Sequence, residues 1–249
     1  MTRGTPPRGI FVVDAPWPAI ARRLEAGAIA VLPIGAAAKE HGPHLPLGTD
    51  WYQAEWLARE LVRRSDVVVW PTLNYGFYPV FVDYPGSIST SQAIFVALVT
   101  EIALGLQQAG AARVVILNTG ISTIGPLETA LGDVRLVCEK QLINVYHGPR
   151  FTKASATLAE QTFGGHADEI ETSLMLAIAP QLVDLTRAVP ATTHIARGLF
   201  NRYAPDAPNF SASGVNGNPT LASATKGEQF LHAMLADVEA EFEITGAHP

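Results

Sequence analysis

The sequence predicts an α/β fold, namely a three-layer α/β/α sandwich with a mostly parallel central sheet. Two observations support this fold class. Short apolar runs typical of strands alternate along the chain with longer segments of helical spacing. The runs at 28–35 and 112–120 are almost continuously apolar, which is typical of strands that helices cover on both faces. Because no linker divides the 249 residues, we expect one domain spanning residues 1–249.

The individual elements follow from hydrophobic periodicity. For example, the segment 50–64 carries Leu57 and Leu61 on one side of an amphipathic helix. The expected strands are 9–14, 28–35, 66–73 and 112–120, with one or two more within 134–147. The expected helices are 16–27, 50–64, 90–110 up to Gly110, 168–180 up to Pro180, and 224–244. The segment 181–223 is rich in proline, asparagine, glycine and serine, which predicts an irregular surface excursion or an active-site rim.

Composition and charge restrict the partners. Hydrophobic residues make up 48% of the chain and charged residues only 16%, which predicts a large core and faces buried in a homo-oligomer. The net charge of −6 argues against a nucleic-acid partner, which usually requires a basic surface. No apolar run approaches the ~20 residues that cross a bilayer, so we expect no membrane partner.

Two features suggest the cytoplasm. Cys138 is the single cysteine, which excludes an internal disulfide and suits a reducing compartment. The N-terminal stretch MTRGTPPRGIFVV is interrupted by prolines and an arginine, so it lacks the apolar centre of a signal peptide. We therefore expect a cytoplasmic protein.

A first polar cluster lies in the stretch AAAKEHGPHLPLGTDW, residues 36–51. Glu40, His41, His44 and Asp50 lie within eleven residues, directly after a predicted strand. Ligands bind beyond the carboxyl ends of strands in such sheets, and imidazole with carboxylate suits Zn²⁺, Mn²⁺ or Fe²⁺. The alternatives are that Asp50 caps the following helix and that His44 is simply exposed.

A second cluster lies in GGHADEIETSLMLAIAP, residues 164–180. His166 follows two glycines, and Glu171 lies in a helix that is apolar around most of its circumference. A lone buried carboxylate is costly, so Glu171 requires a metal, a cation or an exposed first turn. Asp168 and Glu169 are expected to stabilise the N-terminus of that helix.

These motifs resemble those of the creatininase (creatinine amidohydrolase) family. The stretch LPIGAAAKEHGPHLPLGTD is similar to the first block of the family, and YGFYPVFVDYPGSIS at 75–89 resembles the second. HADEIETSLMLAIAP resembles the third block, and SGVNGNPTLASATKGEQFL at 213–231 resembles the C-terminal one. The resemblance spans about residues 28–231.

The resemblance implies a creatininase-like α/β/α domain, often assembled as a hexamer, and a metal-dependent hydrolase that acts on carbon–nitrogen bonds. In such members two divalent metals share an aspartate, which matches Asp50. A histidine matching His41 binds one metal, and a glutamate two residues earlier binds the other. The histidine matching His166 transfers protons at the substrate, and the glutamate matching Glu171 lies near the metals.

Two departures from the family pattern change the expected metal count. Lys39 stands two residues before His41, where the family has its glutamate, and Glu40 is adjacent instead. In LNTGIST, Gly120 stands in place of a histidine ligand and Ser122 in place of another ligand. We therefore expect one tightly bound ion rather than two. Zinc is favoured over manganese or iron, and the candidate ligands are Glu40, His41, Asp50 and Glu171.

The expected reaction is hydrolysis of a cyclic amide, a formamide or a short amide by a metal-activated water, with His166 and Glu171 as catalytic residues. Creatinine itself is disfavoured because the ligands of the second metal are missing. Tyr78, Phe81, Ser122 and His44 are the candidate contacts to this small-molecule substrate. Two alternatives stay open: a non-catalytic ligand-binding member of the fold, and a metal-assisted ring-opening hydrolase that acts on a non-amide bond.

Overall fold

The computed structural model describes residues 6–195 and 200–245, and within these ranges five strands form a single sheet in the order β1-β3-β2-β4-β5. Every neighbouring pair of strands is parallel. The strands are β1 (Ile10–Phe11), β2 (Ile29–Ile34), β3 (Val67–Val69), β4 (Arg113–Asn118) and β5 (Glu139–Asn144). The predicted parallel sheet is therefore confirmed.

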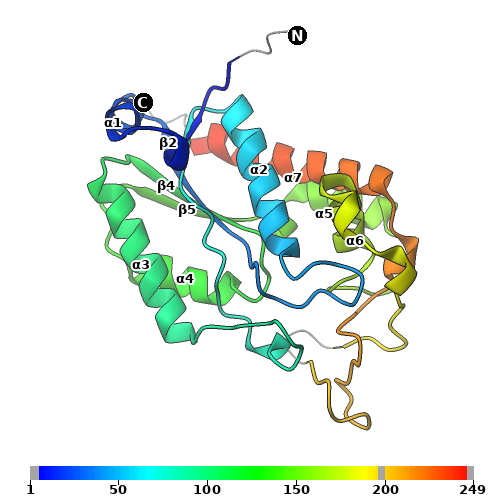
Figure 1. Cartoon of the computed structure of the whole chain (residues 1–249). Coiled ribbons are helices and arrows are strands. Elements are labelled where there is room, and N and C mark those ends of the chain that lie inside the picture. The colour runs from blue at the N-terminus through cyan, green and yellow to red at the C-terminus, as the bar shows by residue number, and fades with distance from the viewer. Residues whose placement is uncertain (1–5, 196–199, 246–249) are drawn as a thin grey trace.

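Helices cover both faces of the sheet. They are α1 (Trp17–Glu25), α2 (Thr49–Arg64), α3 (Gln92–Gln108), α4 (Ile124–Asp133), α5 (Pro149–Leu158), α6 (Glu169–Ile178) and α7 (Ala224–Thr245). Figure 1 shows α2 and α7 on one side of the sheet and α3 and α4 on the other. This arrangement is the three-layer sandwich that the sequence predicts.

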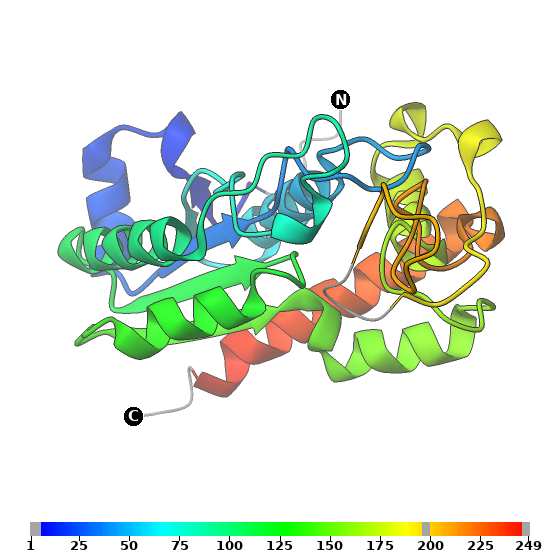
Figure 2. The same ribbon diagram turned by 90° about the horizontal axis from the view of Figure 1, so that it is seen from below.

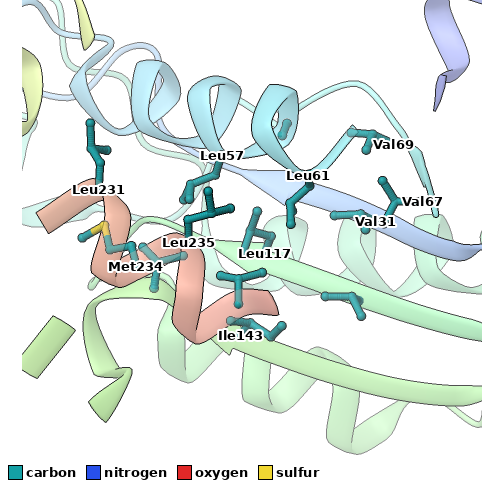
Figure 3. Close-up of a cluster of buried hydrophobic side chains, with 14 of the residues drawn as sticks. Val31, Leu57, Leu61, Val67, Val69, Leu117, Ile143, Leu231, Met234 and Leu235 are labelled. Carbon is teal, nitrogen blue, oxygen red and sulfur yellow. The ribbon is translucent and has the colours of Figure 1, made fainter. Parts of the chain in front are cut away.

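Alternating side chains of the strands supply both halves of the core. Val31 and Leu117 pack with Leu57 and Leu235 on the face covered by α2 and α7, as Figure 3 shows. Their sequence neighbours, such as Leu32, face the opposite way and pack beneath α1, α3 and α4. The period of two in a strand explains why continuous apolar runs serve both layers.

The order of the strands creates a switch point beside β2. The chain passes from β2 to β3 on one side, whereas β4 pairs with the other side of β2. In such sheets the crevice at the carboxyl ends of the two central strands is the usual ligand site. Figure 2 shows the blue loop after β2 and the orange segment near 200–218 at the same end of the molecule.

The structure differs from the sequence prediction in four elements, one of which is the strand predicted at 66–73, where only Val67–Val69 forms β3. Helices α4 and α5 were not expected, because both are short and α4 contains two glycines and Pro126. Pro126 lies in the first turn of α4 and Pro149 begins α5, where proline costs little because these N–H groups lack helical partners anyway. The strand predicted at 9–14 is shorter, since Val12–Asp14 forms a 3₁₀ turn.

Two further regions were left open by the sequence. The segment 134–147 holds the single strand β5 followed by a 3₁₀ turn. The described part of 181–223 contains no α-helix and only short 3₁₀ turns, as the irregular prediction required. Among the described residues, none of the helices combines the length and the apolar character needed to cross a lipid bilayer.

Shortening Leu57 tests the core on the α2 face. Leu57 is fully buried, so Leu57→Ala removes apolar contacts and leaves a cavity. We expect the free energy of unfolding to fall by about 2–5 kcal/mol, measured by urea denaturation. Val137 is 94% exposed, and Val137→Ala should change the same quantity by less than about 0.5 kcal/mol. Equal effects of the two substitutions would contradict this core assignment.

Candidate metal centre

A close backbone approach places the loop after β2 against the start of α2. A Cβ atom at Gly35 would collide with the backbone carbonyl of Asp50, so only glycine fits there. Thr119, which follows β4, donates its hydroxyl to the carbonyls of Ile34 (3.0 Å) and Asp50 (2.8 Å). The ends of β2 and β4 are thereby tied to the first turn of α2, at the switch point.

The Asp50 carboxylate is buried and shared between two side chains of the loop. One oxygen, Oδ2, accepts a hydrogen bond from Lys39 Nζ at 2.7 Å, and the other, Oδ1, lies 3.0 Å from His41 Nε2. Asp50 is 1% exposed. The N-cap of α2 is Gly48, and no side chain caps this helix. The alternative that Asp50 is a capping residue is therefore wrong.

Lys39 and Asp50 are both ionised in spite of their burial. Desolvation would raise the pKa of Asp50, but the Lys39 ammonium and the His41 imidazole hold it below its ordinary value of 3.8. Desolvation would likewise lower the pKa of Lys39, but Asp50 and then Glu171 keep it above its ordinary value of 10.5. Each charge therefore supports the other in a site that is largely buried.

The hydrogen bonds of His41 indicate a ligand. His41 Nδ1 lies 2.9 Å from the carbonyl of Lys39, and a carbonyl can only accept, so this nitrogen carries the hydrogen. Nε2 then faces Asp50 Oδ1 and, at 4.0 Å, Glu171 Oε1. A lone pair that faces two carboxylates requires a proton or a metal cation between them. An imidazole whose other nitrogen donates to a backbone carbonyl is typical of metal ligands.

Glu40 and His166 form a second buried pair. Glu40 Oε2 lies 3.0 Å from His166 Nε2, and Oε1 accepts from the backbone N–H of Gly42. Gly214 lies against this carboxylate with a φ of +79°, where any side chain would collide with Glu40. Burial would raise the pKa of Glu40, but His166 keeps it lowered. Burial would lower the pKa of His166, but Glu40 and then Glu171 keep it raised.

Glu171 completes the cluster at the start of α6. His41, His166 and Glu171 each offer a ligand atom, and these three atoms lie within 4.8 Å of one another, so they form a candidate metal site. Glu171 Oε2 accepts from the Ala167 N–H at 2.6 Å and lies 3.8 Å from His166 Nδ1. Ala167 has a φ of +49°, a strained conformation for alanine that places its N–H toward Glu171.

A cavity of about 320 Å³ opens onto this cluster. Its polar walls include Lys39, His166 and Glu171, and its apolar walls include Phe81 and Phe200. The Phe81 ring lies 4.3 Å from the His166 ring between centroids, and Phe200 meets the same imidazole edge-on at 5.4 Å. This volume suits a small molecule held by a few polar groups.

The other candidate substrate contacts are placed differently. Ser122 lines the main cavity and also a space of about 10 Å³ beside Asp50, which Tyr78 and Gly120 line as well. Burial raises the pKa of the Tyr78 phenol to about 12. Its hydroxyl is buried and has no hydrogen-bond partner of ordinary geometry among the described residues.

His44 does not line that cavity and is not exposed. It is buried against α6, with Nε2 2.8 Å from the Thr172 hydroxyl, and burial lowers its pKa to about 4. The structure therefore places His44 in the packing between loop and helix, where it stays neutral, rather than at the substrate as expected. Its position between two prolines gave no sign of this contact, because Thr172 lies 128 residues away.

The remaining acidic residues of the second cluster are structural. Asp168 is the N-cap of α6 and accepts from the N–H groups of Ile170 and Glu171, as its expected role at the helix start requires. Glu169 is buried and pairs with Lys226. Phe200 and Asn216 also line the cavity and were not expected from the sequence, which predicted either a surface excursion or an active-site rim for residues 181–223.

The fold is therefore a parallel α/β sandwich with a buried imidazole–carboxylate cluster at its switch point, and the cluster could hold a metal ion. The chain belongs to the creatininase family, since the family model "Creatininase: Creatinine amidohydrolase" matches residues 14–242. It is 27% identical to creatinine amidohydrolase of Pseudomonas putida, covering 93% of this chain and 95% of that protein.

Two further relatives are named for other substrates. The chain is 26% identical to the 3-dehydro-scyllo-inosose hydrolase of Thermotoga maritima, over 94% of this chain and 82% of that protein. It is 27% identical to the mycofactocin precursor peptide peptidase of Mycolicibacterium smegmatis, over 82% of this chain and 80% of that protein. The family therefore comprises hydrolases whose substrates differ.

Solved structures share the fold. A crystal structure of creatinine amidohydrolase matches with a TM-score of 0.80 and 23% identity, covering 97% of this chain and 99% of that one. A creatininase described as the Mn form has a TM-score of 0.79 at 23% identity, covering 96% of this chain and 100% of that one. A creatininase variant described as Zn–Zn type has a TM-score of 0.81 at 24% identity, covering 96% of this chain and 99% of that one.

Neutralising Asp50 tests the buried ion pair in the metal-free protein. Asp50→Asn leaves the Lys39 ammonium facing a neutral amide, so we expect the free energy of unfolding to fall by about 1–3 kcal/mol in chelator. Urea denaturation measures this quantity. Asp184 is exposed and caps a 3₁₀ turn, so Asp184→Asn should cost less than about 0.5 kcal/mol. Similar small costs for both variants would contradict the ion pair.

The Glu40–His166 pair predicts a defined pH dependence. His166 has a raised pKa, so its contribution to stability is complete below its unfolded value of 6.5 and is lost as pH rises through the folded value. Glu40 has a lowered pKa, so its contribution is complete above its ordinary value of 4.5 and is lost on acidification. The stability advantage of metal-free wild type over Glu40→Gln should therefore be largest between about pH 4.5 and 6.5. Unfolding curves across pH 4–9 measure it, and a constant difference would contradict the pair.

Proposed function

We propose that this protein is a metal-dependent hydrolase that cleaves a carbon–nitrogen bond in a small cyclic amide, formamide or short amide. The main support is that ligand atoms of His41, His166 and Glu171 converge within 4.8 Å, and that His166 and Glu171 line a cavity sized for a small molecule. Family membership supports hydrolysis, and the related Mn and Zn–Zn creatininases support manganese or zinc. Zinc is our first choice.

His41, Asp50 and Glu171 would hold the ion. His41 Nε2 lies 3.0 Å from Asp50 Oδ1 and 4.0 Å from Glu171 Oε1. Two ligands that each bind zinc at about 2.0–2.2 Å lie roughly 3–4 Å apart, so these separations fit one shared ion. Glu40 was expected among the ligands, but both its oxygens are engaged by His166 and Gly42. We therefore assign Glu40 to His166 instead.

A divalent ion bound there would lower the pKa of a water molecule and polarise the scissile carbonyl. Glu171, which would hold the ion through Oε1, would accept the proton of the attacking water on its carboxylate. The water oxygen bonds to the carbonyl carbon, the carbon–nitrogen bond breaks, and the departing nitrogen takes a proton from His166. Glu40 raises the pKa of His166 and so favours its protonated imidazole. A protonated imidazole can donate a proton but cannot bind a metal, because a histidine ligand must be neutral. His166 therefore suits the role of proton donor better than that of metal ligand.

The shape of the cavity favours a small, partly apolar substrate. Phe81 and Phe200 pack against the His166 ring, so a substrate that reaches this imidazole also contacts two aromatic faces. Ser122 offers a hydroxyl from the loop after β4. Because the named substrates of the relatives differ, a substrate screen should include lactams, formamides, short peptides and a cyclic ketone as the non-amide member.

Metal analysis tests this proposal. Protein purified without chelators should contain about one equivalent of zinc or manganese, and His41→Ala should contain less than about a tenth. His232 lies exposed on α7, and His232→Ala should keep the wild-type content. His166→Asn should keep the ion and lose at least about a hundredfold in hydrolysis rate. Metal-free wild type that gains no ion from added Zn²⁺ or Mn²⁺ would overturn the proposed function.

A further inference from the structure

Lys39 is a buried cation inside the candidate active site. The residue is 5% exposed and lines both the main cavity and the small space beside Asp50. Its ammonium is held at 2.7 Å from Asp50 Oδ2 and lies 5.2 Å from the centre of the Phe81 ring. A salt bridge and an aromatic face together fix this charge in one place.

The position of the ammonium removes a ligand from any second ion. Asp50 Oδ2 is the oxygen that faces away from His41, and Lys39 already occupies it. The small space on this side has a volume of about 10 Å³, and Gly120 and Ser122 on its wall offer no carboxylate or imidazole. With Lys39 on Oδ2, this side offers a second ion no free carboxylate or imidazole, and zinc sites in proteins are built from such groups.

We propose that the Lys39 ammonium is the built-in second cation of this site, so that the protein binds one divalent ion where the Zn–Zn creatininase is described with two zincs. This inference rests on the proposed function, because it presumes that His41, Asp50 and Glu171 hold an ion. Lys39 is a positioning residue here: it neutralises Asp50 Oδ2 and excludes a metal from that side.

Zinc titration by calorimetry, with elemental analysis of the dialysed protein, tests the inference. Wild type should bind about one zinc per chain, and Lys39→Glu should bind about two, because the substitution removes a cation and adds a ligand. Lys153 is exposed on α5, and Lys153→Glu makes the same charge change without adding a ligand, so it should bind about one. Far-ultraviolet circular dichroism establishes that each variant is folded.

Lys39→Met provides a second test that does not depend on Lys39→Glu being folded. Removing the neighbouring positive charge should tighten binding of the single zinc by at least about tenfold. A merely structural lysine would leave the affinity unchanged or weaken it, and that result would overturn the inference. Two zincs in wild type, or one zinc in folded Lys39→Glu, would also overturn it while the proposed function stands. No zinc in wild type would overturn both.

Discussion

The Asp50 carboxyl group is the interaction on which the arrangement of this site depends. Its two oxygens bind Lys39 and His41 from the loop after β2, and its backbone carbonyl accepts from Thr119 after β4. One residue in the first turn of α2 therefore joins the two central strands at the switch point. Gly35 makes this possible, because a side chain there would push the loop away from α2. The polar side chains Lys39 and His41 of this loop are directed to the Asp50 carboxylate.

The alternation of side chains along residues 39–41 divides the site into two halves. Lys39 and His41 both reach Asp50, whereas Glu40 between them turns to His166. Adjacent side chains of an extended segment face opposite ways, so Glu40 and His41 could converge on one ion only through a bulge. The structure resolves this conflict differently: His166 lies between the halves, with its ring 4.9 Å from the His41 ring and its Nε2 on Glu40.

The sequence predicts the sheet and the two motifs, because continuous apolar runs and clustered polar residues are local features. It does not predict α4 and α5, whose prolines and glycines hide short helices that tertiary packing stabilises. The Glu40–His166 pair spans 126 residues, and the cavity wall takes Phe200 from an irregular segment. No local pattern encodes such contacts. Lys39 stood out in the sequence only as a missing ligand, and its role required the observed salt bridge.

A lysine and a metal ion neutralise a carboxylate in different ways, and the difference defines this site. A divalent ion also binds water and lowers its pKa, whereas an ammonium supplies a fixed single charge and N–H donors without acidifying water. Lys39 therefore neutralises Asp50 whether or not a metal is bound, and in the proposed mechanism activation of water would be left to the ion at His41 and Glu171. Because the ammonium lines the cavity, its free N–H groups can also bind a substrate oxygen. In the proposed mechanism the fixed charge of Lys39 lies on one oxygen of Asp50, and the ion that would activate water lies on the other oxygen.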